Sequence, residues 1–151
     1  MTRTQMIMIA MGGSALLLGG AFLFQFAGYP PCKMCLWQRW PHAAAIAIGL
    51  LALGVKVRIL ALLGALAALT TSAIGFFHAG VEQGFWEGPT SCSSGSISGL
   101  TPDELLEQIM NAPLVRCDDI AWQFAGISMA GWNALLSLGL ALVWIMAFRR
   151  A

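Results

Sequence analysis

Two cysteines at close spacing, Cys32 and Cys35, stand in the stretch PPCKMCLWQRW, directly before an apolar run. Two more cysteines, Cys92 and Cys117, lie much farther along the chain. The CxxC spacing is typical of thiols that form and break a disulfide, and an even number of cysteines allows full pairing. Of the three possible connectivities, Cys32 with Cys35 and Cys92 with Cys117 is the natural one. The residues therefore predict thiol and disulfide exchange.

A zinc site is the main chemical alternative for these cysteines. A structural zinc site needs two close-spaced pairs of ligands, whereas Cys92 and Cys117 are far apart, and His42 and His78 lie in or beside apolar runs. A haem attachment site is excluded because leucine, not histidine, follows the second cysteine of the CxxC motif. We expect redox chemistry and no metal.

The elements that must position these thiols are membrane helices. Apolar residues make up 58% of the 151-residue chain and charged residues only 10%, a composition unlike that of a soluble globule. Crossing a bilayer takes about 20 apolar helical residues, too many for the apolar core of a cleaved signal peptide. Four long apolar runs predict an all-α membrane protein, a four-helix bundle of one domain (1–151), with helices at about 6–27, 36–55, 58–78 and 126–148.

The segment 80–125 is the longest connection between these helices and is predicted to be a loop outside the membrane. It contains a glycine- and serine-rich stretch around Cys92. Within LTPDELLEQIM, Thr101, Pro102 and Glu104 form the pattern of a helix start. We expect a short amphipathic helix near 102–110, lying on the membrane or on top of the bundle.

The basic residues predict the orientation in the membrane, because lysine and arginine accumulate on the cytoplasmic side. If both termini face the cytoplasm, five of the eight basic residues lie there: Arg3, Lys56, Arg58, Arg149 and Arg150. All four cysteines then face outward. Cysteines on an oxidising side favour disulfide chemistry.

Arg39 lies four residues after Cys35, which on a helix is the same face one turn farther along. The start of the helix points free amides at the Cys35 sulfur and favours its thiolate. A cation beside a reactive sulfur near lipid suits an electron acceptor that becomes negatively charged. The alternative for Arg39 is an interfacial residue that reaches the headgroups. His78 is either a satisfied interfacial histidine or a hydrogen-bond donor at a site.

The electrons are expected to leave through the membrane. Two dithiol pairs on one face can pass a disulfide between them through a mixed intermediate. The loop pair is placed to meet a soluble protein, and the CxxC pair to meet a molecule dissolved in lipid. The sequence has no cytoplasmic cysteine under this orientation, no motif for a bound cofactor and no basic patch for nucleic acid. A membrane-soluble oxidant such as a quinone is therefore the expected acceptor.

Three motifs together carry a resemblance to a known family: CKMCLWQRW entering the second helix, FFHAGVE ending the third, and RCDDIAWQFAGISMAGWN entering the fourth. The chain resembles, over nearly its whole length, the DsbB family of membrane proteins that generate disulfides. The resemblance implies a place in the bacterial inner membrane, with periplasmic cysteines and a role in periplasmic protein folding. It also implies ubiquinone or menaquinone as the oxidant.

The resemblance further implies the roles of individual residues. Cys92 and Cys117 would oxidise a DsbA-like partner of the thioredoxin fold, Cys32 and Cys35 would reoxidise them, and Cys35 would reduce the quinone. By position, Arg39 matches the family's arginine on the quinone side and His78 its histidine near the quinone. Met129 is expected in the same pocket.

Two other functions fit parts of the pattern. A vitamin K epoxide reductase-like enzyme also links thiols to a quinone, but its loop cysteines precede the CxxC motif, and here the order is reversed. A non-enzymatic membrane adaptor with structural disulfides would leave the CxxC pair inert.

Overall fold

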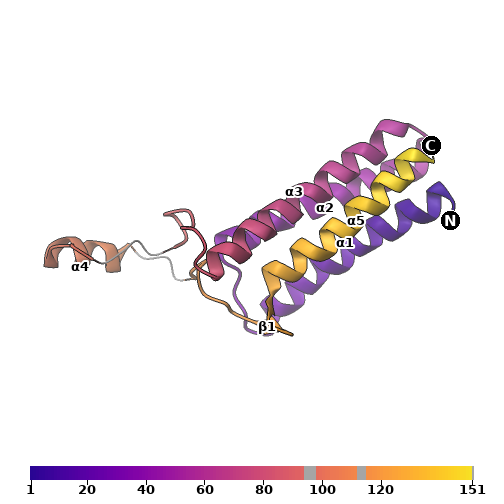
Figure 1. Ribbon diagram of the computed structural model, residues 1–151. Helices are drawn as coiled ribbons and strands as arrows, with labels where there is room; N and C mark the ends of the chain where they lie inside the picture. The colour runs from indigo at the N-terminus through magenta and orange to yellow at the C-terminus, as the bar shows by residue number, and fades with distance from the viewer. Residues whose placement is uncertain (94–97, 112–114, 151) are drawn as a thin grey trace.

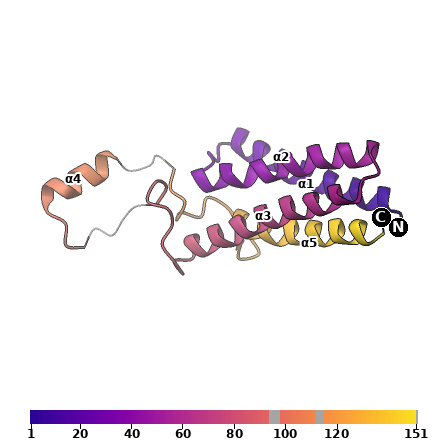
Figure 2. The same ribbon diagram turned by 90° about the horizontal axis from the view of Figure 1, so that it is seen from above.

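A computed structural model describes residues 1–93, 98–111 and 115–150. Four long helices lie side by side as a bundle (Figure 1). α1 packs against α2 and α5, and α3 packs against the same two helices, so the four close into a ring. Both termini and the α2–α3 turn lie at one end of this bundle, and the long connection between α3 and α5 leaves from the other end (Figures 1 and 2).

The first two helices start at side chains that cap them. α1 spans Arg3–Phe26 and begins at Thr2, whose side chain accepts a hydrogen bond from the Gln5 backbone amide. α2 spans Lys33–Gly54, and its N-cap is Cys32, whose sulfur accepts a hydrogen bond from a backbone amide of the first turn. Both helices begin three residues earlier than the sequence predicts, because the cap and not the first apolar residue determines the start.

The other two long helices extend beyond or begin after their predicted limits. α3 spans Arg58–Glu82, one turn longer than predicted, because His78 and Glu82 share a face that points into the protein rather than to solvent. α5 spans Met129–Arg149. It starts later than predicted because β1 (Gln123–Phe124) and β2 (Ile127–Ser128) form a short antiparallel hairpin. Ala125 and Gly126 both have positive φ, as a tight hairpin turn requires.

Small residues let α3 and α5 come close together. A Cβ atom placed on Gly75 would lie 2.9 Å from the backbone oxygen of Ala130. Farther along, Gly64 leaves room for the indole of Trp144, which is fully buried in the bundle core. Because lipid is as apolar as the side chains, such close packing is a main source of stability between membrane helices.

The long connection carries the short helix α4 (Pro102–Met110), capped by Thr101 and Glu104 in a capping box. α4 lies apart from the bundle in both views (Figures 1 and 2), and its apolar residues Leu106, Ile109 and Met110 are exposed. Of the two expected positions, it does not lie on top of the bundle; a position on the membrane stays a prediction. Segments 94–97 and 112–114 of the predicted loop lie outside the described residues.

Three of the helices are long and apolar enough to cross a membrane: α1, α3 and α5. α2 has a comparable length of 22 residues, but its first half carries Lys33, Gln38, Arg39 and His42. The structure is that of an all-helical protein suited to a membrane. Four membrane crossings stay a prediction.

The close contact at Gly64 leads to a stability prediction. Gly64→Ala should lower the melting temperature in detergent, because the new Cβ would lie 2.6 Å from the Trp144 ring, and overpacking costs about 1–3 kcal/mol. Gly139→Ala is the matched control, since a Cβ there meets nothing within 4 Å. Equal melting temperatures for the two variants would contradict this account of the core.

Candidate functional site

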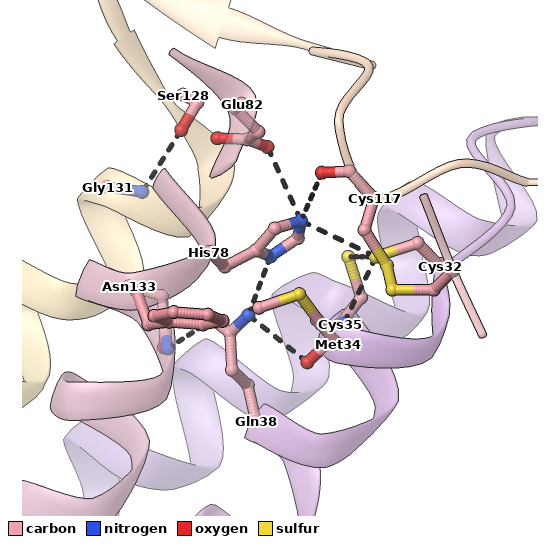
Figure 3. A network of polar contacts seen from close by, with 12 residues as sticks. Cys32, Met34, Cys35, Gln38, His78, Glu82, Cys117, Ser128, Gly131 and Asn133 are labelled. Carbon is pink, nitrogen blue, oxygen red and sulfur yellow. Dashed lines mark hydrogen bonds and ion pairs between the residues drawn. A yellow bond between two sulfur atoms is a disulfide. The ribbon is translucent and has the colours of Figure 1, made fainter. Parts of the chain in front are cut away.

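The four cysteines come together at the end of the bundle opposite the termini. Cys32 and Cys35 lie at the start of α2, Cys92 follows α3 in the chain, and Cys117 precedes the hairpin. Cys32, Cys92 and Cys117 form one buried cluster with Met34 and Val81, and the partly buried Cys35 packs against it. Figure 3 shows the loop disulfide beside Cys32. Residues distant in sequence therefore form a single sulfur centre.

The loop pair is joined and covered. Cys92 and Cys117 form a disulfide, and the Cys117 amide donates a 2.6 Å hydrogen bond to the Cys92 carbonyl. The two residues are only 1% and 0% exposed. Beside them, a hydrogen bond from Arg116 lowers the pKa of Asp118, so this ion pair is fully formed at neutral pH. The sequence suggested an accessible loop pair, but in this state the pair is closed from solvent.

The CxxC pair is present as two free thiols. The sulfur atoms of Cys32 and Cys35 lie 3.0 Å apart, at hydrogen-bond distance. The backbone amide of Cys35 donates a 3.2 Å hydrogen bond to the Cys32 sulfur. The sequence had suggested that the amides of the helix start point at the Cys35 sulfur, but this amide contacts Cys32. The hydrogen bond to Cys35, followed by burial, raises the pKa of the Cys32 thiol.

His78 contacts one cysteine of each pair (Figure 3). Its Nε2 is 3.1 Å from the Cys117 carbonyl oxygen and 3.5 Å from the Cys32 sulfur. Glu82, one turn farther along α3, places an oxygen 3.8 Å from the same nitrogen. Of the two interpretations of His78 left open by the sequence, these contacts favour a hydrogen-bonding group at a site.

A chain of polar side chains continues from His78 into the bundle. Gln38 Nε2 lies 3.0 Å from His78 Nδ1, and Gln38 Oε1 accepts from Asn133 Nδ2 at 2.7 Å. Asn133 Oδ1 in turn lies 2.8 Å from His42 Nε2. Sequence reasoning assigned no role in the site to Gln38, Asn133 or His42. The available signal was their polarity within otherwise apolar helices, where polar side chains usually serve a function.

An apolar cavity of about 460 Å³ opens beside Cys35. Its polar wall includes Cys35, Gln38, Arg39, His42 and Asn133, and Met129 also lines it. Aromatic and aliphatic residues form much of the remainder: Leu16, Leu17, Phe24, Trp122, Phe124 and Trp132. Thus Cys35 touches both the sulfur cluster and the cavity, whereas His78 is not among the residues that line it.

Arg39 shares the cavity wall with Cys35, as their spacing on one helix predicts. Its guanidinium donates to the Gln25 side chain at 2.7 Å and to the Ala21 carbonyl at 3.2 Å, and it lies over the Phe22 ring. Its Nε is buried without a hydrogen-bond partner among the described residues. The guanidinium therefore holds α1 to α2 while its Nε has no partner among the described residues.

The ligand atoms of Cys32, Cys35 and His78 lie within 4.8 Å of one another, close enough for a metal ion. However, His78 Nε2 faces the carbonyl oxygen of Cys117, and a carbonyl oxygen only accepts hydrogen bonds. The nitrogen must therefore carry a proton in this arrangement. A protonated nitrogen is a hydrogen-bond donor and not a metal ligand, so the contacts favour thiol chemistry.

Comparison with known proteins agrees with this arrangement. The family model described as "Disulfide bond formation protein DsbB" matches residues 3–147. The similar proteins include several named disulfide bond formation protein B, of which three are described. The one from Polaromonas sp. JS666 is 28% identical, with 99% of this chain and 92% of its own covered. The one from Shewanella sp. MR-4 is 32% identical, with 84% of this chain and 77% of its own covered. The one from Azoarcus sp. BH72 is 30% identical, with 91% of this chain and 87% of its own covered.

No solved structure shows a significant match to the chain. The family match extends over nearly all of it, from the first turn of α1 almost to the end of α5. It includes all four cysteines and the cavity wall. This chain belongs to the DsbB family of disulfide bond formation proteins.

Proposed function

We propose that this protein is a membrane thiol:quinone oxidoreductase that generates disulfides. The observation that carries the proposal is the position of Cys35, which packs against the buried sulfur cluster and also lines the apolar cavity. Electrons arriving as thiols on the loop pair would pass to the CxxC pair and leave through the cavity. The geometry supports such a path because one residue touches both compartments.

The state of the cysteines fits one point in this cycle. The loop disulfide is closed and the CxxC pair is reduced. This is the state expected after the CxxC pair has oxidised the loop pair and before it is itself reoxidised. The contacts support Cys32 as the exchange partner: His78 Nε2 contacts both the Cys32 sulfur and the Cys117 carbonyl, so the exchange would pass through a Cys32–Cys117 mixed disulfide.

The proposed source of electrons is a periplasmic DsbA-like dithiol protein of the thioredoxin fold. Names of the relatives refer to disulfide bond formation, and the loop pair is the one held by a connection outside the bundle. Because Cys92 is only 1% exposed, the partner must displace part of the covering chain before its thiolate reaches the sulfur.

The proposed acceptor is a membrane quinone, ubiquinone or menaquinone. The cavity has apolar and aromatic walls suited to a flat ring and an isoprenoid tail. Two buried nitrogens on its wall, Arg39 Nε and His42 Nδ1, have no hydrogen-bond partner among the described residues, and buried polar groups without partners are rare. A bound quinone would supply a two-electron acceptor, and these residues would bind and orient its oxygens.

Of the predicted quinone-binding residues, Arg39 and Met129 lie on the cavity wall. That they contact the quinone stays a proposal. His78 instead contacts the Cys32 sulfur and the Cys117 carbonyl and is not among the residues that line the cavity. A direct contact between His78 and the quinone stays a prediction, and its hydrogen bonds support a role in disulfide exchange.

Turnover of purified components tests the proposed function. With a reduced DsbA-like partner and a soluble quinone analogue, quinone absorbance should fall only when the protein is present. Cys92→Ser should abolish oxidation of the partner, because it removes the loop disulfide, yet leave Cys32 and Cys35 oxidisable by quinone. If Cys92→Ser still oxidised the partner at the normal rate, the proposed order of the two cysteine pairs would be wrong. Absence of turnover with any quinone would leave the adaptor function.

Arg39 should affect the quinone step more than partner oxidation. Negative charge grows on sulfur and on the quinone oxygen during reduction, and a cation in an apolar cavity stabilises it. We expect Arg39→Ala to raise the quinone KM and slow quinone reduction by up to about a hundredfold, with Arg39→Lys intermediate because it keeps the charge and loses the planar fork.

The anchoring role of Arg39 needs a separate control. Gln25→Leu removes the 2.7 Å hydrogen bond that ties Arg39 to α1 but keeps the cation. Because the cation and its electrostatic effect remain, the quinone KM of Gln25→Leu should stay within about twofold of that of the unmodified protein. Equal defects in Gln25→Leu and Arg39→Ala would mean that Arg39 acts only as a link between helices.

We also propose that both termini face the cytoplasm and the sulfur cluster faces the periplasm of the inner membrane. In a variant with all native cysteines changed to serine, Asp103→Cys in α4 should react with a membrane-impermeant maleimide on intact spheroplasts. Lys56→Cys, in the α2–α3 turn at the opposite end, should react only after lysis. The reverse pattern would invert the topology.

A further inference from the structure

The polar chain behind the sulfur cluster joins three helices and ends at the redox residues (Figure 3). Gln38 comes from α2, His78 from α3 and Asn133 from α5. Gln38 is 6% exposed and His78 is 2% exposed. Amide and imidazole groups can each be oriented in two ways, so the direction of every hydrogen bond has to be deduced from partners whose role is certain.

The first certain partner is a backbone carbonyl near Gln38. Gln38 Nε2 lies 3.2 Å from the Met34 carbonyl oxygen, which only accepts. Gln38 Nε2 therefore donates one hydrogen to this carbonyl, and its second hydrogen points to His78 Nδ1 at 3.0 Å. His78 Nδ1 must accept, so the proton of the neutral ring is on Nε2.

A second backbone carbonyl prevents the Gln38 side-chain amide from adopting the flipped orientation. The Thr71 hydroxyl donates to the Gln38 backbone oxygen at 3.0 Å, so the Thr71 oxygen is free to accept from Asn133 Nδ2 at 3.1 Å. The same Asn133 amide donates to Gln38 Oε1 at 2.7 Å. If the Gln38 amide were flipped, its N–H group would face the N–H group of Asn133.

The opposite end of His78 leads independently to the same tautomer. Nε2 lies 3.1 Å from the Cys117 carbonyl oxygen, which again only accepts. Gln38 on one side and Cys117 on the other therefore both require the proton on Nε2. That N–H group is also 3.5 Å from the Cys32 sulfur.

We propose that Gln38, held by Asn133, is a positioning residue that keeps the His78 proton on Nε2, so that this N–H stabilises Cys32 as a departing thiolate. The inference rests on the proposed exchange between the two cysteine pairs. It gives the buried amides a function in catalysis, although among the described residues neither amide hydrogen-bonds to a cysteine sulfur.

The step concerned is the one that closes the loop disulfide. The Cys92 thiolate, having lost its proton to water, attacks the Cys117 sulfur of the Cys32–Cys117 mixed disulfide. The Cys92–Cys117 bond forms, the Cys32–Cys117 bond breaks, and the electron pair stays on the Cys32 sulfur. A leaving thiolate of lower pKa departs faster. Cys32 would receive hydrogen bonds from His78 Nε2 and from the Cys35 backbone amide, as in this structure.

Two titratable side chains contact the Cys32 sulfur in the described part of the chain, Cys35 from α2 and His78 from α3. Glu82, also from α3, lies 3.8 Å from the same His78 nitrogen. The loop segment contributes Cys117, which does not titrate because it is in the disulfide. Since Cys35 shifts the titration of Cys32 through a direct hydrogen bond, a test of His78 needs a background without the Cys35 thiol.

The test measures the pKa of Cys32 in the full-length Cys35→Ser protein, from the pH dependence of its alkylation by iodoacetamide in detergent. His78→Ala should raise this pKa by about one unit, the loss of one hydrogen bond to a charged group. Gln38→Met keeps the side-chain volume but frees the His78 ring to change tautomer. The Cys32 pKa in this variant should therefore lie between the values for the Cys35→Ser background and for His78→Ala. Asn133→Leu should act in the same direction.

Thr70→Val is the matched control, because Thr70 neighbours Thr71 but donates only to the Leu66 carbonyl at an exposed position. Its Cys32 pKa should equal that of the background. An unchanged pKa in both Gln38→Met and Asn133→Leu would overturn the inference, as would an unchanged pKa in His78→Ala. If Gln38→Met fails to fold, Asn133→Leu decides by itself.

The readout separates this inference from the proposed function, because alkylation needs neither quinone nor partner. Raised Cys32 pKa values together with no quinone turnover would overturn the proposed function and keep the effect of Gln38 on His78. Normal turnover together with unchanged pKa values would overturn only the positioning role of Gln38.

Discussion

Polar side chains inside an apolar helix bundle must find their partners within the bundle, and this constraint organises the redox end of the molecule. An unpaired buried polar group costs about 1–3 kcal/mol, and lipid offers no water in its place. Gln38, Asn133 and Thr71 satisfy one another across three helices. Because two backbone carbonyls set the direction of these bonds, the network also determines how His78 faces the sulfurs.

The buried sulfur centre follows from this support. His78 touches both the CxxC pair and the loop segment, so the loop cysteines dock where a donor is already oriented. Burial lowers the local dielectric constant, which strengthens each hydrogen bond to a developing thiolate. It also means that access by a protein partner and exchange between the two pairs need different arrangements of the covering chain, since the loop disulfide is almost fully enclosed here.

The cavity side of Cys35 has a different character. Arg39 holds α1 to α2 through Gln25 and Ala21 while one of its nitrogens remains unpartnered. A cation that is already fixed by two hydrogen bonds needs little reorganisation when negative charge appears beside it, which is the condition for effective electrostatic stabilisation. Structural anchoring and charge stabilisation are thus compatible in one side chain.

The sequence by itself determined the features that depend on composition or on spacing along one segment: a helical membrane protein, the CxxC pair at a helix start, and Arg39 on the same face as Cys35. It did not identify the hairpin before α5, where Ala125 adopts a positive φ. Only the tertiary structure decided the roles of Gln38, Asn133 and His42. Their partners lie on other helices, with 40 residues between Gln38 and His78 and 95 between Gln38 and Asn133, and no local pattern encodes which helix faces meet.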